Sequence, residues 1–277
     1  MADLAFEDRA TGALIGALIG DALAVGPHWY YNLDELRAAY GPWISGYTTP
    51  KPGRYHEGLK AGESSQAGVL LELTMRSLAA CGQYDEADFC QRLERDFFPQ
   101  IDGTPNHGPG GYTSQSIRET YRLRVTLGRP WGQTSGWADT TEAAERVLAI
   151  AVRDARNVGA LAEHVSSNTA LTQCDGVVGA MTTAYGLALG LLVQGERFDG
   201  QITDKLMQRV RAGALPFHSV TKEGEDAVPD GPERARKPGQ YPSPDALIGM
   251  GQIGGAPIEP AVRIEPAWKV SEVYGMP

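Results

Sequence analysis

Apolar residues recur along most of the chain at the spacing of an amphipathic helix. In 64–80 and 85–98 the large apolar side chains follow one another three or four positions apart. The same criteria, together with helix start and stop signals, predict further helices in 33–39, 114–127, 158–165, 175–194 and 203–212, and one that opens at Asp139. Alternating β-branched strands are nearly absent. The pattern therefore predicts an all-α fold.

Two predicted helices carry glycines on one side, one within 9–29 and the other at 175–194. In the first, the stripe is Gly12, Gly16 and Gly20, and the remaining faces are apolar. A helix that is apolar all round belongs in a protein interior, so we expect this one and the glycine-lined helix 175–194 to lie at the centre. The first of them ends near Asp21. A carboxylate at the end of a buried helix needs a cation, a metal or backbone donors, which first indicates a site.

Composition limits the class of protein. The 277 residues are 42% hydrophobic and 21% charged, as in ordinary soluble globular proteins, and the net charge of −9 argues against a nucleic-acid or anionic-membrane partner. Three scattered cysteines favour reduced thiols in the cytoplasm. The opening segment lacks a basic signal-peptide start and is too short to span a membrane. We expect one domain over 1–277 with a flexible loop at 222–244, and the oligomeric state stays open.

Polar residues gather at four predicted helix ends. They are Asp21, Glu63–Gln66, Asp139–Glu142 and Asn168–Asp175. Helix capping explains three of them without any function, and Asp139 with Glu142 has the spacing of a capping box. Asp21 differs, because a helix C-terminus disfavours negative charge.

Other candidate motifs give weaker signals. The five histidines lack zinc-ligand spacing, and His28 alone lies close to a candidate site. The glycine-rich stretch 108–116 precedes a helix and is a candidate phosphate-binding loop, although it lacks a P-loop lysine.

The order of the segments resembles the ADP-ribosylglycohydrolase family. The matching pieces are GALIGDALAVG (12–26), GLKAGESSQAG (58–68), TTEAAERVLAIAV (140–152) and the stretch 168–196. The phrases YGPWISGYTTPKPGRYHEGLKAG and GPGGYTSQSIRE are most similar to the J-crystallin branch. The resemblance implies an all-α, single-domain orthogonal helical bundle. It also implies two Mg²⁺ ions in a cleft and hydrolysis of the N- or O-glycosidic bond between ADP-ribose and a protein side chain or small molecule.

The chain departs from the family's two metal-binding motifs. The first aligns with Gly62–Ser65 and keeps one carboxylate where the family has two, and the chain ends before the second. The remaining metal candidates are Glu63, Ser64 and Asp21. Because Mg²⁺ needs more anionic ligands than these provide, we do not expect a di-magnesium site. A truncated chain with exposed apolar surface is a further expectation.

Two functional hypotheses follow. The first, which we favour, is a hydrolase of ADP-ribosyl or related bonds, with Asp21 and Glu63 as the acid and base. Its binding residues would be Ser64, Ser65 and Gln66 for water or ribose, Gly110, Gly111 and Tyr112 for the diphosphate, Arg146 as an inner cation, and His28. Asp139 and Asp175 are second-rank candidates for the site. The alternative is a non-catalytic relative, either a ligand-binding protein or a crystallin-like structural one.

Overall fold

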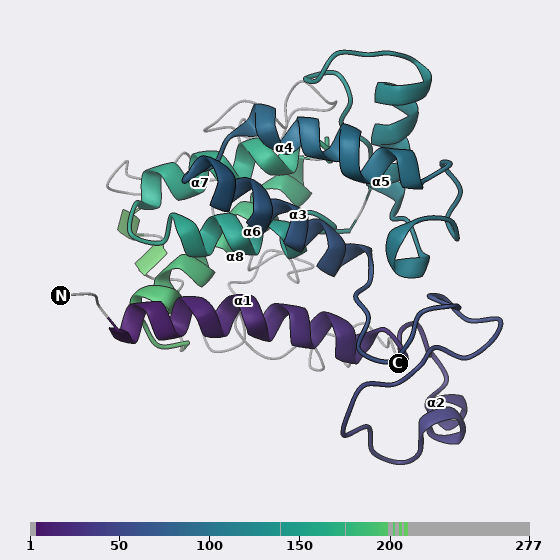
Figure 1. Ribbon diagram of the computed structural model, residues 1–277. Helices are drawn as coiled ribbons and strands as arrows, with labels where there is room; N and C mark the ends of the chain where they lie inside the picture. Colours follow the sequence, from purple (N-terminus) through teal and green to yellow (C-terminus); the bar gives the residue numbers. More distant parts are fainter. Residues whose placement is uncertain are drawn as a thin grey trace, which may run out of the picture.

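The computed structural model describes residues 4–138, 140–174 and 176–198, together with residues 202, 205, 206, 208 and 209. Regular structure in these residues is helical, apart from one isolated β-bridge between Gly136 and Gln173 (Figure 1). The predicted all-α fold is thus confirmed. Asp139, Asp175, the loop 222–244 and most of the predicted helix 203–212 lie outside the described residues.

The helices lie close to their predicted positions. The α-helices are α1 (Leu4–Ala24), α2 (Leu33–Tyr40), α3 (Gln66–Cys81), α4 (Glu86–Arg92), α5 (Gln115–Tyr121), α6 (Ala144–Arg153), α7 (Val158–Ala170) and α8 (Gly176–Gln194). The predicted helices 85–98 and 114–127 each change to a π-helical turn, at Leu93–Phe97 and Arg122–Thr126. Helix α7 runs five residues beyond the predicted 158–165. Among the described helices, none is long and apolar enough to cross a membrane.

Capping residues account for several helix ends. Ser65 caps α3 through a bond from the Ala67 N–H to its Oγ, at 3.1 Å. Asp85 caps α4 in the same way, accepting from the Asp88 N–H at 3.0 Å. Gly82 ends α3 with a φ of 72°, a conformation that glycine adopts without steric cost.

The expected capping box at 139–142 is wrong. Helix α6 begins at Ala144, and the N–H of Ala143 donates to Gln173 Oε1 at 2.8 Å. Glu142 instead accepts from the Ser116 N–H at 2.9 Å, which satisfies an N-terminal donor of α5. The start of α6 is therefore held by residues far away in the sequence.

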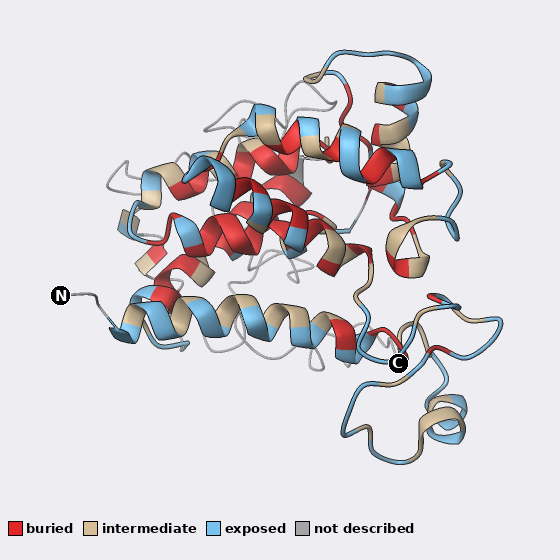
Figure 2. Cartoon of the chain, viewed as in Figure 1, coloured by how far each residue is buried: buried red, intermediate tan, exposed pale blue. Residues whose placement is uncertain are grey.

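Helix α6 occupies the centre of the bundle. It packs against α3, α7, α8 and α1, and Val147, Ile150 and Ala151 are fully buried (Figure 2). A second core cluster lies between α3, α4 and α5 and contains Phe89, Leu93 and Ile117. The predicted central position is thus filled by α6 together with α8.

Helix α1 contradicts the prediction of a buried glycine rod. It lies along one side of the bundle, and Ala22 is its buried residue (Figures 1 and 2). The helix contacts the core through partly buried residues such as Leu14 and Leu18. A Cβ built on Gly12, Gly16 or Gly20 would meet no atom of the described residues within 4 Å, and all three glycines are exposed. The stripe therefore faces away from the bundle.

Candidate functional site

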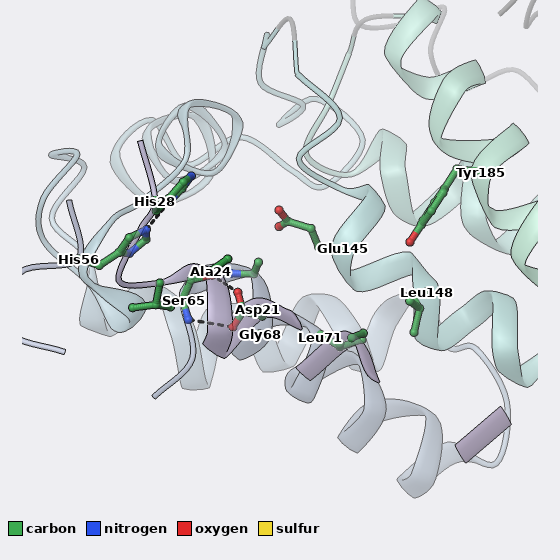
Figure 3. A pocket seen from close by; sticks show the side chains of 13 residues that line it. Asp21, Ala24, His28, His56, Ser65, Gly68, Leu71, Glu145, Leu148 and Tyr185 are labelled. Atoms are coloured by element: carbon green, nitrogen blue, oxygen red, sulfur yellow. Dashed lines mark hydrogen bonds between the residues drawn. The ribbon is translucent and has the colours of Figure 1, made fainter. Parts of the chain in front are cut away.

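A pocket of about 290 Å³ lies where α1 ends, α3 begins and α6 passes (Figure 3). Pockets that bind small molecules typically measure roughly 300–1,000 Å³, so this one suits a group the size of one sugar ring. Its polar and aromatic lining comes from the end of α1, two loops, the start of α3, α6 and α8: Asp21, His28, His56, Ser65, Glu145 and Tyr185.

Asp21 is anchored at the N-terminus of α3. Its Oδ2 accepts from the Ser65 N–H at 2.9 Å, and its Oδ1 accepts from the Ser65 hydroxyl. A helix N-terminus favours an anion, and this supplies the backbone donor that the sequence analysis expects for Asp21. A Cβ on Gly68 would lie 2.3 Å from Asp21 Oδ2. Glycine at this position therefore leaves room for the side chains of Asp21 and Ser64.

Glu145 is the second carboxyl group of the pocket, and sequence reasoning missed it. It lies in the first turn of α6 and points toward the pocket (Figure 3). Surrounding protein, and then the negative charges of Asp21 and Glu142, raise the pKa of Glu145 to about 7. Glu145 is nonetheless exposed to solvent, so its proton can exchange with water.

Arg146, the expected inner cation, is not part of the pocket. Its side chain is 1% exposed and contacts Asn168 through Nε to Oδ1 at 2.7 Å and Nη2 to the carbonyl at 2.9 Å. Nη2 also donates to Thr172 Oγ1 at 2.9 Å, and the guanidinium lies over the Phe89 ring. Desolvation lowers the pKa of Arg146 to about 10. This arginine joins α6 to α7 inside the core.

Two histidines form one wall of the pocket. His28 Nδ1 lies 2.6 Å from His56 Nε2, and the two rings stack with centroids 4.9 Å apart. His56 Nδ1 lies 2.6 Å from the Gly110 carbonyl oxygen. Burial, and then the proximity of His56, lowers the pKa of His28 to about 4. His28 was expected near the site, whereas His56 was not singled out.

The expected phosphate loop has a packing role instead. A Cβ on Gly110 would lie 2.0 Å from the Gln66 nitrogen, and one on Gly111 would lie 2.8 Å from His56 Cα. The Gly111 N–H donates to the Gly108 carbonyl at 3.1 Å. The Tyr112 ring packs edge-on against Trp29. The glycines thus let the loop approach α3 and His56, and they do not form an open cradle.

The other residues from the first motif do not converge on the pocket. Glu63 is exposed, and its Oε2 accepts from the Lys60 N–H at 2.8 Å. Gln66 is buried and exchanges two hydrogen bonds with Ser114, at 2.8 and 3.0 Å. Ser64 packs beside Gly68. The expected pairing of Asp21 with Glu63 is therefore not what the structure brings together.

These positions also test the fit of magnesium. Asp21 and Ser64 lie side by side at Gly68, but Glu63 accepts from the Lys60 N–H, and both Asp21 oxygens already accept from Ser65. In the part of the chain that the structure describes, no three histidine, cysteine or acidic side chains are placed to hold a metal. The described residues do not fit a di-magnesium site.

The fold and pocket define an all-α protein with a small, largely apolar cavity that holds two carboxyl groups. The family model of ADP-ribosylglycohydrolase matches residues 2–259. The chain therefore belongs to the ADP-ribosylglycohydrolase family. Among curated proteins no sequence match is found.

Proposed function

We propose that the protein hydrolyses an ADP-ribosyl or related N- or O-glycosidic bond in the pocket between α1, α3 and α6. Family membership supports glycohydrolase chemistry in general. The observation that carries the specific site is the pair of carboxyl groups, Asp21 and Glu145, in one cavity with different environments. Pairs of carboxyl groups kept in different protonation states are typical of glycosidases.

The two groups take different roles in this mechanism. Glu145, whose pKa is raised to about 7, donates a proton to the leaving atom as its bond to the anomeric carbon breaks. Asp21 accepts both of its hydrogen bonds, as an ionised carboxylate does. Its negative charge stabilises the positive charge that develops on the sugar ring.

The lining also limits how a substrate would bind. Among the described residues around the pocket there is no lysine or arginine. A diphosphate would gain little there, so we place the ribosyl group inside and the phosphates beyond the opening. Positively charged leaving groups, such as a guanidinium, would be attracted by Asp21.

Two finer assignments belong to the same proposal. The segments 40–62 and 108–119 support a place in the J-crystallin-like branch of the family. Cys81 and Cys90 are free thiols, which supports a cytoplasmic location.

A non-catalytic relative is the second candidate, and one observation favours it. Both Asp21 oxygens are occupied by Ser65, so this carboxylate is less available to a substrate. A protein of this kind would bind ADP-ribose in the pocket without releasing it from a conjugate.

Product release separates the two candidates. Wild-type protein is incubated with ADP-ribosyl-arginine (N-linked) and ADP-ribosyl-serine (O-linked), with Mg²⁺ or with EDTA, and free ADP-ribose is quantified by chromatography. We expect release from at least one conjugate and its loss in Glu145→Gln. Glu72→Gln is the matched control, because Glu72 is exposed on α3 and pairs with Arg76.

Glu63→Gln provides the discriminating variant. Since Glu63 is exposed and bonded to its own loop, we expect this variant to keep wild-type activity. Loss of activity in Glu63→Gln with retention in Glu145→Gln would overturn the site assignment. Absence of release from both conjugates, with ADP-ribose still bound, would establish the non-catalytic candidate.

A further inference from the structure

The contacts of the histidine pair fix where its protons lie. A carbonyl oxygen can only accept, so the 2.6 Å contact with Gly110 requires a proton on His56 Nδ1. In a neutral imidazole the other nitrogen, His56 Nε2, then carries a lone pair. The 2.6 Å contact with His28 Nδ1 needs one proton, which His28 must supply. This leaves His28 Nε2 unprotonated.

The surroundings favour the neutral form of His28. His56 is 2% exposed and has no carboxylate bonded to it among the described residues. His28 resists protonation because burial and the neighbouring ring lower its pKa to about 4. The ionisable groups that share the pocket are Asp21, Glu145 and Tyr185, on three different helices.

Two residues in the loops that carry the histidine pair have an uncommon left-handed backbone conformation. His56 has a φ of 63°, and Trp29, the residue after His28, has a φ of 58°. Positive φ for such residues costs about 1–3 kcal/mol and persists where the surroundings enforce it, often at functional sites. Trp29 is held between the Tyr55 and Tyr112 rings, and Gly111 packs on the His56 backbone. The loop geometry is thus specified from several sides.

We propose that His28 is the general base of the hydrolysis and that His56 is a positioning residue that holds it in the Nδ1–H tautomer. The chain of contacts runs from the Gly110 carbonyl through His56 to His28 Nδ1. It leaves His28 Nε2 as a hydrogen-bond acceptor on the side away from His56 (Figure 3). The inference rests on the proposed function, because the pocket must hold the reacting sugar.

The proton balance closes with groups of this pocket. The glycosidic bond breaks and the leaving atom takes the proton of Glu145. A water oxygen bonds to the anomeric carbon, and its proton passes to His28 Nε2. His28 then returns a proton to solvent and Glu145 takes one up, so the enzyme is restored. His28 and Glu145 approach the cavity from different walls, the loop after α1 and the first turn of α6.

The tautomer can be read without any activity assay. In protein labelled with ¹⁵N-histidine, we expect the His28 side chain at pH 7 to show a protonated Nδ1 and an unprotonated Nε2. His56→Asn keeps a donor for the Gly110 carbonyl and removes the acceptor for His28, so the His28 tautomers should mix. His56→Gln retains an acceptor and should restore the Nδ1–H form. A wild-type His28 that is protonated on Nε2 at pH 7 would overturn the proposal.

Kinetics test the catalytic role separately. His28→Asn keeps a donor to His56 and deletes Nε2, and we expect kcat for ADP-ribose release to fall about 100-fold with little change in KM. His107→Asn is the matched control, because His107 is exposed in a loop outside the pocket. In wild type, kcat/KM should rise with pH through about 4 as His28 loses its proton.

The two proposals fail in different ways. Wild-type activity that is lost in Glu145→Gln and kept in His28→Asn would overturn the base assignment alone. No activity in wild type with either conjugate would overturn the proposed function and the base role with it, and the ¹⁵N spectrum would then report the tautomer only.

Discussion

Glu145 and Arg146 are neighbours on α6, and the bundle uses them in opposite ways. Arg146 points into the core, where uncharged oxygens of Asn168 and Thr172 hold its charge. Glu145 points into the pocket, where no hydrogen bond to it is present among the described contacts and its pKa is raised. One step along a helix turns a side chain by about 100°. A charged side chain on α6 therefore stabilises the fold if it faces the core, and it is available for chemistry if it faces the pocket.

The glycine-lined helices α1 and α8 show the same division. Cβ atoms on Gly186 and Gly190 of α8 would lie 3.1 Å from Val165 and 2.5 Å from Leu161 of α7. Equivalent atoms on the α1 glycines would meet nothing within 4 Å in the part of the chain that the structure describes. The same sequence signal therefore marks a packed seam in α8 and an outward face in α1.

Replacing Arg146 should have the largest effect. Arg146→Met leaves the buried acceptors on Asn168 and Thr172 without a donor, and we expect a loss of about 4 kcal/mol in unfolding free energy. Urea denaturation measures it. A loss below about 1 kcal/mol would mean that this cation is not a core element.

Glu145→Gln should show the converse behaviour. Removing a general acid is expected to lower kcat by about 100-fold, which corresponds to roughly 2.7 kcal/mol in the barrier. Its urea midpoint at pH 4 should match wild type, because the carboxyl is then largely protonated in both the folded and the unfolded state. Equal kcat values for variant and wild type would contradict the division between the two neighbours.

A matched pair of substitutions tests the two glycine helices. Gly190→Leu forces a side chain against buried Leu161 and should destabilise the protein by about 2 kcal/mol. Gly16→Leu places the same side chain where no described residue would meet it, and it should leave stability unchanged or raise it by up to about 1 kcal/mol. Similar losses in both would contradict the outward orientation of the α1 stripe.

The smallest expected effect is on the pH dependence of stability. The pKa of Glu145 is about 7 in the folded state against an ordinary 4.5. The folded state then binds more protons than the unfolded state between these values, so stability falls as pH rises from 4.5 to 7 and is level above. Because the residue reaches solvent, we expect about 1 kcal/mol or less. The gain of Glu145→Gln over wild type should grow across this range and disappear below it.

Local signals predicted the helices well. Ser65 and Asp85 begin helices and Gly82 ends one, as their residue types suggest. Capping depends on neighbours in sequence and can therefore be predicted from it. The meeting of Asp21 with the start of α3 was also expected, because the sequence analysis places both in one site; the N-terminus of α3 stabilises the carboxylate that the C-terminal end of α1 disfavours.

The features that the sequence did not predict depend on tertiary contacts, which hydrophobic periodicity does not reveal. Glu142 has capping-box spacing, yet Ser116 from another helix binds it. From the sequence, Glu63 is named as a catalytic carboxyl group because it lies in a recognisable motif. Which face of α6 lines the pocket is decided by the packing of α6 on α3, so the sequence does not single out Glu145. His56 follows no metal or catalytic spacing, and its left-handed backbone has no sequence signal of the kind that glycine provides.

A crystal structure of the protein soaked with ADP-ribose tests the central claim most directly. The account predicts density for the terminal ribose between Asp21 and Glu145, with the diphosphate beyond the pocket opening. Density for the ribose in the separate cavity beside Trp29 and Tyr55, with the first pocket empty, would contradict it.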